Sequence, residues 1–187
     1  WQGFDPKTWT ADVIGFDEHP QAVDPAVLVS WNNKPAPGWG AADDQWGYGP
    51  IYRSQMIEQR IRADIADGRK MRMSDLVQAM EEPATQDIRG VKLLPTLFTA
   101  VGSPRDPQLK SALDELRSWR AAGSHRRDLD RDGAYEHTNA IEIMDAWWPL
   151  LVEAQFRPTL GRKAYEAVQS IIGIGAVPGG SPRAPGF

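Results

Sequence analysis

The chain changes character near residue 50, and this change limits the folds that it can adopt. Residues 1–50 hold five of the eight Trp, together with many Pro and Gly, and show little helical periodicity. From residue 51 onward, apolar residues recur at the three- and four-residue spacing of a helix face. A segment so rich in loops rarely builds its own core, so we expect residues 1–50 to lie against other polypeptide. The sequence therefore predicts a mainly α fold with a loop-rich front segment.

One or two short strands are expected in the loop-rich segment, the clearer one at residues 27–31, whose β-branched and apolar residues suit a buried strand. Residues 51–175 form the expected helical region, and residues 176–187 form an expected flexible tail. We expect Pro83 to break or restart a helix that Ser74 caps. The remaining helices are expected near residues 51–65, 93–101, 106–123, 135–151 and 162–172.

Composition argues against two classes of partner. The formal net charge is -4 and the pI is near 5.4, which does not favour a broad nucleic-acid surface. No apolar run approaches the roughly 20 residues of a membrane span. We therefore expect neither nucleic acid nor a membrane as partner.

The sequence has no cysteine and shows no signal peptide at its start. The chain has no Cys, which excludes disulfides, thiolate metal sites and cysteine nucleophiles. Its start, WQGFDPKTW, has neither a basic nor an apolar leader segment and no initiator Met. Trp1 is therefore expected to be an internal or processed start.

Asn32 and Asn33 stand together at the end of the expected strand, ahead of a segment that ends in Arg53. Such a pair commonly forms a turn, because Asn caps turns and tolerates left-handed backbone conformations. Alternatively, a side-chain amide at a rigid strand end can donate to an oxyanion, and one such donor contributes about 3 kcal/mol. The residues alone leave both interpretations open.

The stretch VSWNNKPAPGWGAADDQWGYGPIYR, residues 29–53, resembles the penicillin acylase (penicillin amidase) family of N-terminal nucleophile hydrolases. The shared pattern is Trp-Asn-Asn-x-Pro, then an aromatic residue about seven positions after the first Asn, an Asp near eleven and an Arg near twenty-one. The helical stretch SDLVQAMEEPATQDIRGVKLLPTLFTAV, residues 74–101, is also similar. The resemblance extends from about residue 20 to 120 and is thinner afterwards.

The resemblance implies roles for three residues. Asn32 would donate its side-chain amide to the oxyanion hole, and Arg53 would lie close to the active site. Asp43, or Asp44 if the register shifts by one, would ligate a structural calcium ion. These residue types suit the roles, because calcium prefers carboxylate oxygens and arginine supplies a fixed charge with forked donors.

The resemblance also implies a Ser nucleophile at the N-terminus of the β chain, with its own α-amino group as base. Trp1 occupies the first position here, and the histidines His19, His125 and His137 lie in loop-like or polar contexts without a nucleophile motif. The chain is therefore interpreted as the helical portion of an αββα hydrolase β chain that lacks the nucleophile. Its expected partners are the α chain and the N-terminal part of the β chain, and its expected location is periplasmic or secreted.

A second candidate metal site lies in DLDRDGAYEHTN, residues 128–139. Asp128, Asp130 and Asp132, followed by Gly133, match the first half of a calcium loop. The twelfth position is Asn instead of the usual bidentate Glu, so modest affinity is expected, with Glu136 as a further candidate ligand. The alternative is an Asp-rich turn that caps the following helix, with the neighbouring arginines at 126, 127 and 131 neutralising the carboxylates.

The aromatic residues divide between the two regions. Those of the helical region fall on helix faces, where core packing is expected. Those of the loop-rich segment are candidates for lining a hydrophobic substrate pocket: Trp39, Trp46 and Tyr48.

The expected function of the parent protein is hydrolysis of the side-chain amide of a small N-acylated molecule, with structural calcium and no organic cofactor. Candidate substrates are β-lactam antibiotics, acyl-homoserine lactones, and acylated peptides or lipopeptides. This chain alone is expected to be inactive, because the nucleophile is missing from it. The alternative is a non-catalytic, calcium-stabilised helical binding module, in which the Asn pair is only a turn.

Overall fold

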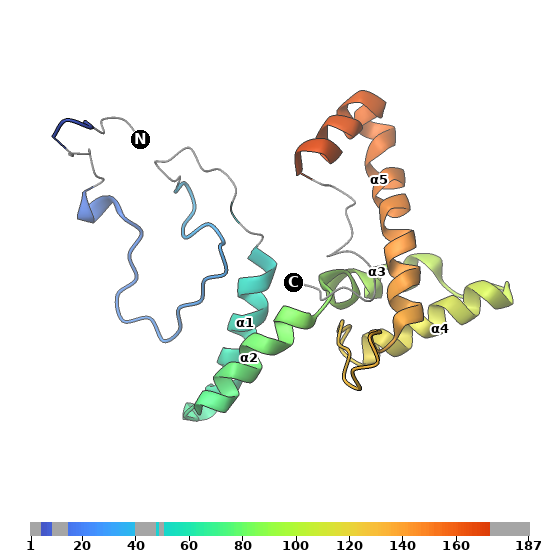
Figure 1. The fold of residues 1–187 in the computed structure, drawn as a ribbon, viewed down its shortest axis with the longest axis horizontal. Helices are drawn as coiled ribbons and strands as arrows, with labels where there is room; N and C mark the ends of the chain where they lie inside the picture. Colours follow the sequence, from blue (N-terminus) through green and yellow to red (C-terminus); the bar gives the residue numbers. More distant parts are fainter. Residues whose placement is uncertain (1–4, 9–14, 40–47, 49–50, 173–187) are drawn as a thin grey trace. The chain divides into compact units, whose positions relative to one another are not determined.

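The structure is a computed structural model that describes residues 5–8, 15–39, 48 and 51–172 (Figure 1). The chain forms two compact units, Trp1–Pro83 and Ala84–Phe187. The described part is mainly helical, as the sequence predicted. The boundary between the two units, after Pro83, falls within a helix. The change in sequence character near residue 50 instead marks the place where the α-helices begin.

Unit 1 contains a short 3-10 turn, η1 (Phe16–Glu18), and two helices joined by η2 (Ala66–Gly68). The helices are α1 (Ile51–Asp64) and α2 (Met73–Thr85), the second of which runs on into unit 2. Arg60 Nε donates to Glu82 Oε2 at 3.1 Å and ties α1 to α2. The buried apolar residues described in this unit are Met56, Ile57, Ala79 and Pro83. So few buried side chains make a small core for a segment of this length.

The prediction of a strand at residues 27–31 is wrong, because these residues form no strand in the structure. Their exposure still alternates: Val27 and Val29 are half-buried, and Leu28 between them is 75% exposed. The backbone is therefore extended with a two-residue period, as the apolar pattern suggested. A strand also needs a hydrogen-bonded neighbour, and none of the described segments supplies a ladder to these residues.

Among its described residues, 84–172, unit 2 contains the end of α2, one π-helical turn and three further helices. The π-helical turn is η3 (Arg89–Leu93), and the helices are α3 (Leu94–Val101), α4 (Pro107–Ala121) and α5 (Thr138–Ile172). Helix α4 packs on α5, and η3 packs on α3 and α4. The core combines residues of α3, α4 and α5 with one residue of the loop before α5: Leu94, Leu113, Leu116, Trp119, Tyr135, Ala140, Ile141 and Met144.

The ends of α4 and α5 follow local sequence signals. Asp106 caps α4, since its side chain accepts hydrogen bonds from the backbone of Gln108 and Leu109, and Pro107 occupies the first turn. Gly161 interrupts α5 with φ 72° and ψ 162°, angles that a residue with a side chain rarely adopts. The expected start of a last helix at Arg162 matches this interruption.

Pro83 does not break its helix, contrary to the sequence expectation. Helix α2 continues through it to Thr85, and the Pro83 ring is buried. The residue lies in the last turn, where a missing N–H removes one helical hydrogen bond and no further turn depends on it. The expected tail at residues 176–187 lies outside the described residues.

None of the helices that the structure describes is both long and apolar enough to cross a lipid bilayer.

Candidate functional site

The two asparagines have different local roles. The Asn33 side chain stabilises a local turn through the backbone of its neighbours. Its Oδ1 accepts the backbone N–H of Trp31 at 2.9 Å, and its Nδ2 donates to the carbonyl of Lys34 at 3.2 Å. Asn32 adopts the left-handed conformation with φ 55°, and its side chain is exposed. Turn chemistry therefore engages Asn33, whereas the amide of Asn32 faces outward.

Arg53 is held beside this turn. Its guanidinium carbon lies 5.4 Å from the centroid of the Trp31 ring, a cation–π contact between the first turn of α1 and the residue before Asn32. The structure thus places Arg53 against the residue that precedes Asn32, and a shared site of Asn32 and Arg53 stays a prediction. The pair offers an amide and a fixed positive charge, groups that can bind a carboxylate or a developing oxyanion.

The expected substrate-binding aromatics are only partly described. The Trp39 ring lies against His19, with the ring centroids 5.6 Å apart. Tyr48 lies under Lys34, whose Nζ is 5.9 Å from the ring centroid. Trp46 and the expected calcium ligand Asp43 lie outside the described residues, as does its alternate, Asp44. A pocket formed by these aromatics stays a prediction.

The Asp128 loop has its three carboxylates close together. One oxygen from each of Asp128, Asp130 and Asp132 lies within 4.8 Å of the others, and all three residues are exposed. Backbone N–H groups fold the loop around these side chains: Asp128 accepts from Asp132 at 3.1 Å and from Gly133 at 3.0 Å. Gly133 has φ 89°, which permits the sharp turn at the sixth position.

The donor set fits part of a calcium site. Calcium takes about six to eight oxygens, and the loop gathers three carboxylates on alternate residues. Glu136, the further candidate ligand, accepts the backbone N–H of Leu129 at 3.1 Å and so helps to fold the loop. The expected neutralising arginines are partly engaged elsewhere, because Arg126 donates to buried carboxylates and Arg127 donates to Thr85 Oγ1 at 2.9 Å.

Sequence reasoning missed the most strongly charged cluster of unit 2. Four side chains make up this buried ion cluster: Asp87, Arg89, Arg126 and Asp145. Asp87 Oδ2 accepts from Arg89 Nη2 at 2.5 Å and from Arg126 Nε at 3.1 Å. Asp145 Oδ1 accepts from the Nη2 atoms of both arginines at 2.5 Å. The cluster joins η3 and the segment just before it to the loop after α4 and to helix α5.

Burial and pairing set the protonation of this cluster. Burial by itself would raise the pKa of Asp87, but the hydrogen bonds and charge of Arg89, followed by the charge of Arg126, outweigh it and lower that pKa. Burial would lower the pKa of Arg89, whereas its contacts with Asp87 and then Asp145 raise it. Both shifts therefore favour the charged forms of Asp87 and Arg89.

The sequence profile of one family, described as penicillin amidase, matches residues 1–183. The chain belongs to the penicillin amidase family. No curated protein and no solved structure gives a significant match. The family match covers both units, so it includes the Asn32–Arg53 turn, the Asp128 loop and the buried ion cluster alike. Membership supports an acylase-type amidohydrolase origin for the chain.

A signal for the buried ion cluster of this penicillin amidase chain was present in its sequence. Asp145 lies on the same helix face as Ile141, Met144 and Trp148, at the spacing of core residues. A carboxylate on such a face needs a buried partner, so an Arg elsewhere in the chain could have been anticipated. Its partners are 19 and 56 positions away, and pattern alone could not identify them.

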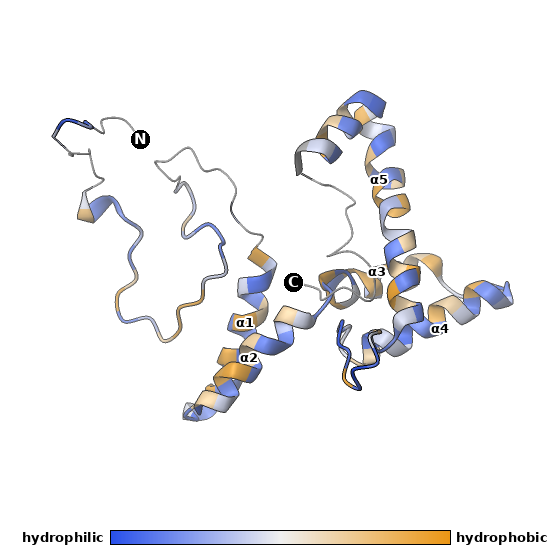
Figure 2. Cartoon of the chain, in the orientation of Figure 1, coloured by the Kyte–Doolittle hydropathy of each residue, from blue (hydrophilic) through white to orange (hydrophobic). Residues whose placement is uncertain are grey.

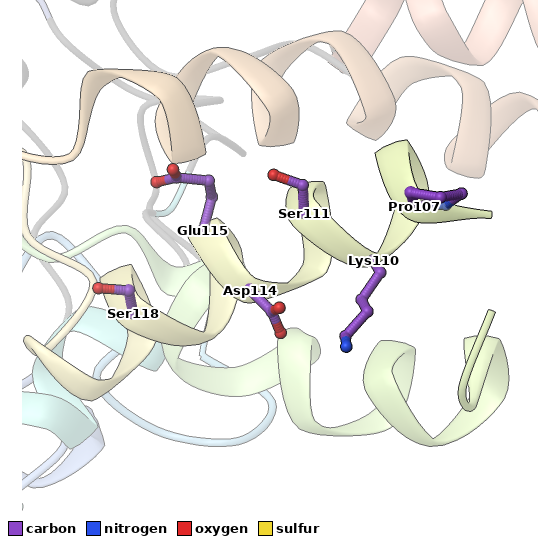
Figure 3. Close-up of a pocket in the computed structure, with 6 residues that line it drawn as sticks. All are labelled: Pro107, Lys110, Ser111, Asp114, Glu115 and Ser118. Atoms are coloured by element: carbon purple, nitrogen blue, oxygen red, sulfur yellow. The ribbon is translucent and has the colours of Figure 1, made fainter. Parts of the chain in front are cut away.

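A hollow of about 420 Å³ runs along α4 (Figure 3). Its lining residues all come from that one helix: Pro107, Lys110, Ser111, Asp114, Glu115 and Ser118. Lys110 and Asp114 carry opposite charges on the same surface, and Asp114 also pairs with Arg117 at 2.9 Å. The hollow is a solvated helix surface without a convergent set of groups, so it is not a candidate active site.

Proposed function

We propose that the chain is part of an amide hydrolase that cleaves the acyl side-chain amide of a small N-acylated molecule. The attacking group is an N-terminal Ser on polypeptide outside this chain, and water then resolves the acyl-enzyme. The α chain and the N-terminal part of the β chain are the protein partners. The enzyme works in the periplasm or outside the cell.

The observation that carries the proposal is the stacking of Arg53 on Trp31. This contact fixes a guanidinium beside the Asn32–Asn33 turn, although α1 and the turn are separate elements. A permanent positive charge and an exposed amide would together suit a site where negative charge develops on a carbonyl oxygen. Membership of the penicillin amidase family supports the reaction type.

In this proposal Asn33 has a structural role and Asn32 a catalytic one. Asn33 holds the turn through the backbone of Trp31 and Lys34. Asn32 therefore keeps its amide available to the tetrahedral intermediate, with the nucleophile delivered from the partner polypeptide. The bond that breaks is the C–N bond of the substrate amide, and the leaving amine takes up a proton.

Paired substitutions in the assembled enzyme test this division. Asn32→Ala should lower kcat by about 100-fold or more, because an oxyanion donor is lost, and leave the unfolding midpoint unchanged. Asn33→Ala is the matched control: it should lower the free energy of unfolding by about 1 kcal/mol, through loss of the Trp31 hydrogen bond, with a smaller effect on kcat. Unchanged turnover in Asn32→Ala would remove this residue from the mechanism.

The isolated 187-residue chain tests the missing nucleophile. It should hydrolyse no N-acyl substrate, because the Ser and its α-amino base are supplied by another polypeptide. Hydrolysis by the pure chain, retained after removal of trace contaminants, would contradict the proposal.

A further inference from the structure

Trp31 is held at two points, one on its backbone and one on its ring. Asn33 Oδ1 accepts the backbone N–H of Trp31 at 2.9 Å, and the guanidinium carbon of Arg53 lies 5.4 Å from the ring centroid. Asn33 is a neighbour in the sequence, whereas Arg53 lies in helix α1. Trp31 therefore links the Asn32–Asn33 turn to the start of α1, and both belong to unit 1.

The start of α1 anchors the backbone of Arg53. Ser54, the next residue, is buried, as are Met56 and Ile57. The Ser54 hydroxyl donates to the carbonyl of Ile51 at 2.9 Å within the first turn of the helix. Figure 2 shows apolar residues interspersed with polar ones along α1. Packing therefore fixes the point from which the Arg53 side chain extends.

The guanidinium of Arg53 needs a second support, because it stands at the end of a long side chain with many rotamers. The Trp31 ring supplies a flat surface, and Trp is the strongest aromatic partner for a cation. Trp31 and Arg53 are both half-buried, which strengthens the attraction relative to a contact in bulk water. The ring therefore restricts where the guanidinium can lie.

The backbone of Trp31 supports the conformation of Asn32. Asn32 has φ 55°, a value that is uncommon for residues with a side chain but tolerated by Asn. The hydrogen bond from the Trp31 N–H to the Asn33 side chain spans Asn32 and closes the turn around it. One residue therefore contacts Arg53 through its ring and supports the Asn32 turn through its backbone.

We propose that Trp31 is a positioning residue whose ring holds the Arg53 guanidinium next to the turn that carries Asn32. This inference rests on the proposed function, because Arg53 needs a set position only if it acts in the amide hydrolase site. A displacement of about 1 Å in such a site can lower the rate by about 100-fold, so the support matters for catalysis. Trp31 itself touches neither the substrate nor the nucleophile in this role.

Nuclear magnetic resonance of the whole 187-residue chain tests the contact without any reaction. Protons of the Arg53 side chain that lie over the indole ring should resonate upfield of their usual position. Trp31→Leu should move these resonances back toward their usual position, and Trp31→Phe should preserve part of the shift. Trp39→Leu is the matched control, since the Trp39 ring lies against His19 and its loss should leave the Arg53 resonances unchanged. Arg53 resonances that do not respond to Trp31→Leu would overturn the inference.

A double-mutant cycle in the assembled enzyme tests whether Trp31 acts through Arg53. Trp31→Leu removes the ring but keeps the backbone N–H, so the hydrogen bond to Asn33 remains. It should lower kcat about 10-fold or more and change KM by less than about threefold, and Trp31→Phe should retain most of kcat. Adding Trp31→Leu to Arg53→Leu should lower kcat by no more than about twofold further, because the contact has already been lost.

The outcomes separate this inference from the proposed function. Normal turnover in Trp31→Leu, with Arg53→Leu impaired, would overturn the positioning role and leave the proposed function intact. Losses that multiply in the double variant would also overturn it, since Trp31 would then act independently of Arg53. Normal turnover in Arg53→Leu would overturn it too, whereas the proposed function is decided separately by Asn32→Ala.

Discussion

Arg126 donates through Nη2 to Oδ1 of Asp145 at 2.5 Å, and this bond ties the loop after α4 to helix α5. The same carboxylate oxygen accepts from Arg89 at the start of η3, so one Asp joins two distant segments. Breaking a buried pair by removing one partner leaves an uncompensated charge, which costs more than the pair itself contributes. The structure of unit 2 therefore depends on all four members of the buried ion cluster.

Asp87→Asn should lower the free energy of unfolding of unit 2 by about 3–5 kcal/mol, because two buried arginines lose a charge partner. Urea unfolding followed by tryptophan fluorescence, to which the buried Trp119 contributes, measures the change. Asp114→Asn is the matched control: it breaks the exposed pair with Arg117, and such pairs contribute at most about 1 kcal/mol. Equal effects of the two substitutions would contradict the role of burial.

The stability of unit 2 should fall in acid. The pKa of Asp87 is lowered in the folded chain, so its contribution is present above the unfolded pKa of about 3.9 and is lost as pH falls toward the folded value. In that window the unfolded chain binds more protons than the folded chain. The free energy of unfolding should drop by at most about 1.4 kcal/mol per pH unit from this group. Urea titrations between pH 3 and 7 test the slope, which Asp87→Asn should reduce.

Substitution of Gly90 by a larger residue should lower the stability of unit 2. A Cβ there would lie 2.5 Å from Ser124 Oγ and 3.2 Å from Trp119 Cη2, so Gly90→Ala should cost about 1–3 kcal/mol of stability. Ser124 has φ 57° and a buried hydroxyl without a hydrogen-bond partner among the described residues. Ser124→Gly should therefore be tolerated alone and should offset most of the cost in the double variant. Additive effects, measured by urea unfolding of all four proteins, would show that Ser124 is not the obstacle.

The helices could be predicted from sequence because their signals are local. Asp106 and Pro107 mark the start of α4, and the spacing of Ile141 and Met144 marks the core face of α5. Strand pairing is not local, so the apolar pattern of residues 27–31 predicted an extended backbone but could not supply a partner.

The candidate sites also divide into a part that the sequence predicted and a part that depends on non-local contacts. The family pattern named Asn32 and Arg53, and the structure adds a contact of Arg53 with Trp31, the residue before Asn32. The buried ion cluster combines residues as far as 58 positions apart, from Asp87 to Asp145, and its pairing follows from how the helices pack. Charged residues show which atoms need partners, but tertiary structure decides which partners they find.

Calcium should stabilise unit 2 through the Asp128 loop, which stays a prediction. The carboxylates of Asp128, Asp130 and Asp132 repel one another within 4.8 Å, and a divalent cation would relieve that repulsion. The melting temperature should rise with added calcium chloride and return to its starting value with a chelator, since a ligand that binds only the folded state stabilises it by mass action. Modest affinity, near the millimolar range of weak calcium sites, is expected because Asn139 replaces the usual bidentate Glu.

Asp130→Asn should remove most of this response to calcium, whereas the exposed control Asp67→Asn, outside the loop, should keep it. A melting temperature that ignores both calcium and chelator would show that the loop is an Asp-rich turn held by its own backbone hydrogen bonds.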